Sequence, residues 1–78
     1  MILTQEDKEE LRALMEVNDA IKGPSFLMRS HWRGRYRKLV CGGLVLWGDP
    51  PEGFDRKKFA GTTITAKGRE AIGCPATG

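Results

Sequence analysis

The sequence predicts an α+β domain in which three helices are followed by a β-hairpin and a short C-terminal helix. Apolar residues recur at helical spacing in the first half of the chain, and a Gly-Gly pair at 42–43 interrupts this pattern. Two β-prone segments then flank a loop that is dense in glycine and proline. The chain has 78 residues, 40% of them hydrophobic, which suits a single core. We therefore expect one domain over residues 1–78, with a flexible tail at 73–78.

The first helix is predicted to begin at Gln5. Thr4 is a good N-cap, and the acidic Asp7 three residues later resembles a capping box. Apolar residues then repeat at helical spacing and define the face that we expect to pack inward, namely Leu11, Leu14, Met15 and Ile21. Gly23-Pro24 should end this amphipathic helix.

Two shorter helices are predicted before the double glycine. Ser25 can cap a helix over residues 26–32, whose apolar residues and Trp32 are expected in the core. Arg33-Gly34-Arg35 then suggests a turn or a helix start. A third helix follows, with an inward stripe formed by Tyr36, Leu39, Val40 and Gly43.

The β-hairpin is predicted from residues 44–47 and a returning strand that ends at residue 65. The loop between them, residues 48–58, contains both Pro50 and Pro51, which cannot donate hydrogen bonds to a ladder. Thr65 can cap a last helix over residues 66–72. The residues that we expect to be largely buried are Leu11, Leu14, Leu39, Leu44 and Ile64.

Two short motifs in this order resemble the winged helix-turn-helix family. Residues 39–45, Leu-Val-Cys-Gly-Gly-Leu-Val, are similar to the end of a recognition helix, where a Leu packs inward and Gly-Leu-Val enters the first wing strand. Residues 64–72 resemble the Thr-x-x-Gly-x-x-Ala-aliphatic ending of the second wing strand in bacterial regulators of the MarR and PadR type. The resemblance implies a winged-helix fold that uses its third helix in the major groove of DNA and its hairpin beside it.

Charge is distributed unevenly along the chain. Residues 1–19 carry a net charge of −4, residues 20–48 carry +6 with no acid, and residues 49–78 carry +1. A basic middle segment is typical of a surface that attracts phosphate or an acidic protein. A solvated basic face without a partner is the simpler alternative.

The candidate nucleic-acid-binding residues come from this basic segment and from the predicted wing. Helical periodicity places Arg37 and Lys38 outward, where they could reach a groove, and the family resemblance places Arg29 and His31 nearer the DNA backbone. In the predicted wing, Asp49, Glu52 and Asp55 would repel a phosphate backbone unless the attraction of the neighbouring cations outweighs this repulsion. The full set is Arg29, His31, Arg33, Arg35, Arg37, Lys38, Arg56, Lys57 and Lys58.

Catalysis and cofactor binding find little support in the sequence. The chain has one His, and its two cysteines, Cys41 and Cys74, are expected to be reduced thiols and not zinc ligands. We therefore expect no enzyme activity, no metal and no cofactor. No apolar run approaches the roughly 18 residues of a membrane-spanning helix, and no secretory signal is visible, so a cytoplasmic protein is expected.

Two functions remain open from the sequence. The first is a small winged-helix DNA-binding protein, a transcriptional or mobile-element regulator of double-stranded DNA, with a homodimer as an option because specific DNA binders usually dimerise. The second is a winged-helix protein-interaction module, an adaptor or phage-encoded inhibitor. Its Arg-rich surface would dock on an acidic protein or a ribonucleoprotein complex.

Overall fold

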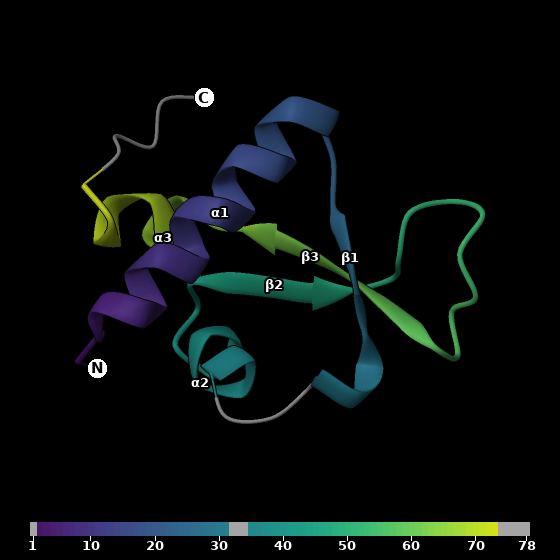
Figure 1. The fold of residues 1–78 in the computed structure, drawn as a ribbon, viewed down its shortest axis with the longest axis horizontal. Helices are drawn as coiled ribbons and strands as arrows, with labels where there is room; N and C mark the ends of the chain where they lie inside the picture. Colours follow the sequence, from purple (N-terminus) through teal and green to yellow (C-terminus); the bar gives the residue numbers. More distant parts are fainter. Residues whose placement is uncertain (1, 32–34, 74–78) are drawn as a thin grey trace.

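Three antiparallel strands and three helices make up the computed structural model, which describes residues 2–31 and 35–73. In the sheet, β3 lies between β1 and β2. Helix α1 packs on one face of this sheet, α2 lies beside β2, and α3 follows β3 near the N-terminal end of α1 (Figure 1). In chain order the elements are α1 (Gln5–Ile21), β1 (Ser25–Met28), the 3₁₀ turn η1 (Arg29–His31), α2 (Arg35–Cys41), β2 (Val45–Gly48), β3 (Phe59–Ile64) and α3 (Ala66–Ala71).

The predicted order of three helices before a hairpin is wrong, and with it the predicted winged helix-turn-helix architecture. The segment expected to be the second helix forms β1 and, over residues 29–31, the 3₁₀ turn η1, while Trp32 lies outside the described residues. Strand β1 pairs antiparallel with β3, so that Phe26 faces Gly61 and Met28 faces Phe59. A helix of seven residues is marginal, whereas a strand here gains a hydrogen-bonded partner along the edge of β3. A small α+β domain neither supports nor excludes kinship with winged-helix regulators, so the resemblance stays a prediction.

Helix α1 begins as predicted. The backbone N–H of Thr4 donates to Oδ2 of Asp7 at 3.0 Å, and the N–H of Asp7 donates to Oγ1 of Thr4 at 3.1 Å, which completes the capping box. Leu11 and Leu14 are buried, whereas Ile21, which was expected in the core, is 55% exposed. The helix therefore packs through its first four turns, and its last turn projects past the core.

The two segments that carry the family resemblance meet in the structure. The N–H of Thr65 donates to the carbonyl of Leu44 at 3.0 Å, and its hydroxyl donates to the carbonyl of Gly43 at 2.7 Å. The same hydroxyl accepts the N–H of Gly68 at 3.0 Å and so caps α3. The predicted antiparallel pairing of the hairpin is confirmed, from Val45 opposite Ile64 to Gly48 opposite Gly61.

The core lies between α1, α2 and the face of the sheet that carries the even-numbered residues of β3. The five residues predicted to be buried are all buried. Val45 and Ile72 complete this cluster. Ile21 and Gly43, the last members of the two predicted inward stripes, are exposed. The ring of Tyr36 meets that of Trp47 edge to face, with centroids 6.2 Å apart, at the margin of the core.

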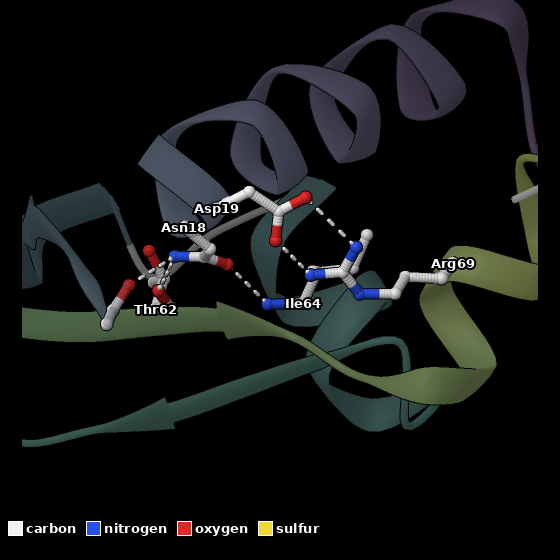
Figure 2. Close-up of polar contacts among 6 residues, drawn as sticks. Asn18, Asp19, Thr62, Ile64 and Arg69 are labelled. Carbon is white, nitrogen blue, oxygen red and sulfur yellow. Dashed lines mark hydrogen bonds and ion pairs between the residues drawn. The ribbon is translucent and has the colours of Figure 1, made fainter. Parts of the chain in front are cut away.

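The amide of Asn18 joins α1 to β3. Its Nδ2 donates to the carbonyls of Gly23 and Thr62, at 3.0 and 3.1 Å, and its Oδ1 accepts the N–H of Ile64 at 2.8 Å. Strand β1 begins opposite Thr62, so the side chain of Asn18 continues the pairing along the edge of β3 that β1 leaves open. Figure 2 shows this amide between the two elements, with the exposed pair Asp19 and Arg69 beside it.

Candidate nucleic-acid interface

The β2–β3 loop, residues 49–58, projects from the end of the sheet that is remote from α3 (Figure 1). Its backbone is held by short-range bonds, because the carbonyl of Asp55 accepts the N–H groups of Lys58 and Phe59 at 3.1 and 2.9 Å. The carboxylate of Asp55 accepts the N–H of Lys57 at 2.8 Å. Gly53 adopts a φ of 97°, a left-handed conformation that favours glycine. The loop therefore has a defined shape from which its side chains project.

Four of the predicted site residues come together at this loop. The Nε of Arg29 donates to the carbonyl of Arg56 at 2.7 Å, and the backbone N–H of Arg29 donates to the carbonyl of Lys58 at 2.9 Å. Arg29 directly follows β1, so the pairing of β1 with β3 is what delivers it to the loop. The set that the fold assembles is Arg29, Arg56, Lys57 and Lys58.

Two of the three acidic residues in the loop are engaged within it. Oδ2 of Asp49 lies 2.8 Å from Nη2 of Arg56 in an exposed ion pair, and Asp55 caps the backbone as described above. Lys57 and Lys58 are exposed, and in the part of the chain that the structure describes they make no ion pair. Because a carboxylate that accepts a backbone N–H keeps its charge, the three cations Arg29, Lys57 and Lys58 are balanced here against two acids, Glu52 and Asp55.

Helix α2 presents fewer cations than its periodicity predicted. Arg37 is exposed as expected, but Nζ of Lys38 donates to Oδ2 of Asp7 and ties α2 to the start of α1. The hydrogen bond from Lys38, followed by that from the N–H of Thr4, lowers the pKa of the Asp7 carboxyl to about 2. Lys38 therefore has a structural role in this fold, and 36% of its side chain stays exposed.

The remaining predicted residues are His31, Arg33 and Arg35. His31 is the last residue of η1, and Arg35 is the first residue of α2. Arg33, like Trp32, lies outside the described residues, as does the predicted tail from residue 74 with its Cys74. Cys41, at the end of α2, is an exposed free thiol.

An aromatic cluster beside the loop was not predicted from the sequence, where Phe26 was expected in the core. The rings of Phe26 and Phe54 stack with centroids 4.3 Å apart and planes 24° apart. Phe59 meets both rings edge to face, at centroid distances of 5.9 and 5.5 Å. Residues 25–28, Ser-Phe-Leu-Met, do not alternate between polar and apolar in the sequence, so no local signal could have found this cluster; the alternation of exposed and half-buried residues arises only in the folded strand.

The described ranges, residues 2–31 and 35–73, hold neither a cluster of metal-ligating side chains nor a helix able to span a membrane. Within them, no group of three His, Cys, Asp or Glu side chains is placed to hold a metal ion. No helix there combines the length and the apolar character needed to cross a bilayer. A scan against protein-family models and searches of curated proteins and solved structures found no match to this chain.

Proposed function

We propose that this protein binds nucleic acid, and that it does so mainly through contacts between exposed cations and the phosphate backbone. The observation that carries the proposal is the gathering of Arg29, Lys57 and Lys58 at a projecting loop, two of whose own acids are bonded inside it. Arginine and lysine at such a position suit phosphate oxygens, because charge-assisted hydrogen bonds reinforce the electrostatic attraction. Double-stranded DNA is the partner that the sequence favoured.

Base recognition by α2 has less support than backbone binding. The helix has seven residues, so it is about 10 Å long at 1.5 Å per residue. Arg37 is exposed on it, whereas Lys38 is bonded to Asp7. A role as a regulator of transcription or of a mobile element depends on sequence-specific contacts, for which Arg37 is the best-placed described residue.

A salt-titrated binding assay with random duplex DNA tests the proposal. Replacing Lys57 and Lys58 by Ala together should weaken binding and reduce the slope of log affinity against log salt, by about one unit for each phosphate that is no longer neutralised. The matched control is Lys8→Ala, which removes an exposed lysine from α1 and should leave the slope unchanged. Absence of wild-type binding to duplex and single-stranded DNA, even at about 50 mM salt, would overturn the proposal.

The second candidate, a protein-interaction module, is favoured by a different observation. The face of the sheet opposite α1 exposes Phe26, Met28 and Leu46. Aromatic residues, methionine and arginine are enriched at protein interfaces, and the partner would be an acidic protein or a ribonucleoprotein complex. A nuclease-treated pull-down that retains one stoichiometric protein, and no longer retains it after Met28→Asp substitution, would support this function over the first.

A further inference from the structure

We propose that the aromatic cluster of Phe26, Phe54 and Phe59 is a stacking site for unpaired bases, so that the preferred ligand is a single strand. This inference rests on the proposed nucleic-acid binding and names its substrate class. Single-stranded nucleic acids are commonly bound by cations along the backbone combined with aromatic rings on which bases stack. In a duplex the faces of the bases are already stacked on one another, so exposed rings would gain little from it.

Strand register places the cluster on the outer face, which we define as the sheet face opposite α1. Direct antiparallel partners project to the same side, and Phe26 pairs with Gly61 while Met28 pairs with Phe59. Leu46, opposite Thr63, lies on this face as well. The core residues Val45 and Ile64 lie on the other side, against α1. None of the described helices covers the outer face, so the rings on it are accessible to solvent.

Gly61 is what lets the loop bring Phe54 onto this face. A Cβ at position 61 would lie 2.0 Å from the carbonyl oxygen of Asp49, so the backbone passes directly over the sheet there. The chain then carries Phe54 to Phe26, and the two stacked residues remain 36% and 51% exposed, respectively. A ring that is stacked on one side and belongs to a residue with half of its surface exposed can accept a further planar group.

Charge complementarity selects a nucleotide chain as the occupant of this face. Lys58 directly precedes β3, which begins at Phe59, and Arg29 directly follows β1, which carries Phe26, so cations flank the ends of both strands that carry rings. Arg29 is bonded to Arg56, which places it beside the loop that carries Phe54. A ligand that matches this pattern presents anionic groups and flat apolar groups in alternation along a chain, as a single-stranded nucleic acid does.

The test compares three ligands of equal length by fluorescence anisotropy at about 50 mM salt. They are an oligothymidine strand of about 12 nucleotides, within the usual site size of small single-strand-binding domains, an abasic strand and a duplex. We expect the thymidine strand to bind at least about tenfold more tightly than the abasic strand. Phe26→Leu should weaken thymidine binding by about five- to 100-fold and leave the abasic strand unaffected.

Leu46→Thr is the matched control, because Leu46 is exposed on the same face but has no ring. It should leave all three affinities unchanged, and an equal decrease in this variant would overturn the proposal in favour of general apolar docking. Equal, salt-dependent binding of the thymidine and abasic strands would overturn the stacking site and leave the proposed function standing. Absence of all binding would overturn the proposed function itself.

A second measurement avoids dependence on variants that unfold. In the wild-type protein, the ring protons of Phe26 and Phe54 should shift when the thymidine strand is added, because a stacked base changes the ring-current field. The abasic strand should not cause this shift. Unchanged ring signals at a concentration of strand that saturates the anisotropy change would place the bases elsewhere and overturn the inference.

Discussion

At the residue scale, polar side chains at both ends of α1 form hydrogen bonds with backbone groups, in the way that a further stretch of backbone would. Asn18 acts as an extra peptide group at the edge of β3, where β1 is too short to continue the ladder. Asp7 and Thr4 satisfy N–H groups at the start of the helix. Neither effect depends on hydrophobic periodicity. The spacing of Thr4 and Asp7 predicted the capping box, but the role of Asn18 depends on a partner more than 40 residues away and has no local signal.

Asn18→Ala should destabilise the protein by about 3 kcal/mol. The substitution removes three hydrogen bonds, including the side-chain acceptor of the Ile64 N–H, and an unsatisfied buried group costs about 1–3 kcal/mol. Urea denaturation checks this value. The control is Asp19→Ala, which removes an exposed ion pair with Arg69 and should change stability much less. Equal effects of both substitutions would contradict the assigned role.

The pair formed by Asp7 and Lys38 should make stability depend on pH in the acid range. The pKa of Asp7 falls from 3.8 to about 2 in the folded state, so the stabilisation is complete above about pH 4 and is lost as the pH falls through about 2. Because the side chain of Lys38 is 36% exposed, water screens the pair, and we expect at most about 2 kcal/mol.

Asp7→Asn isolates this charge, since an asparagine oxygen can still accept the N–H of Thr4. The wild type should be more stable than the variant at neutral pH, and the difference should shrink toward zero near pH 2. Urea denaturation at several pH values measures it. A difference that stays constant over this range would show that packing, and not the ion pair, is responsible.

At the element scale, success and failure of prediction follow the length of each pattern. Helix α1 has 17 residues and two end signals, and α2 and the hairpin were recognised from Leu39, the double glycine and Thr65. Residues 26–32 are too few to separate a helical period from an alternating one. The decisive factor was the edge of β3, a tertiary partner that no local pattern reveals.

The close approach of α3 to Leu44 and Ile64 depends on Gly68. A Cβ at this position would lie 2.3 Å from the carbonyl oxygen of Leu44 and 2.8 Å from Cγ1 of Ile64, so α3 would have to move away from the sheet. Gly68→Ala should therefore cost about 1–3 kcal/mol, although alanine has the higher helix propensity. Gly48→Ala is the control, because a Cβ there meets no atom within 4 Å. Thermal denaturation that ranks Gly68→Ala as the milder change would contradict the packing argument.

At the scale of the whole molecule, the acidic N-terminal segment and the basic middle segment have different roles. Acids of α1 bond to other elements, with Asp7 bound to Lys38, Glu10 to Tyr36 and Asp19 to Arg69. Lys38, one of the expected binding cations, is therefore engaged in an ion pair within the fold. Of the predicted binding cations in the described residues, Arg29, Arg56, Lys57 and Lys58 gather at the β2–β3 loop, while Arg37 is exposed on α2. No sequence pattern connects Arg29 with this loop.

The charge of this loop yields a last prediction, on binding. Asp49 lies 2.8 Å from Arg56, so Asp49→Asn removes one negative charge and releases one cation at the proposed interface. Nucleic-acid binding should become tighter, most clearly at low salt where screening is weakest. Both side chains are exposed, so the stability change should stay below about 1 kcal/mol. Glu52→Gln removes an equal charge without releasing an arginine, and it should strengthen binding less. If the loop instead docks on a protein through its mixed charges, Asp49→Asn should weaken that complex or leave it unchanged. The salt-titrated assay with duplex DNA and with a single strand should then show no gain in affinity for nucleic acid.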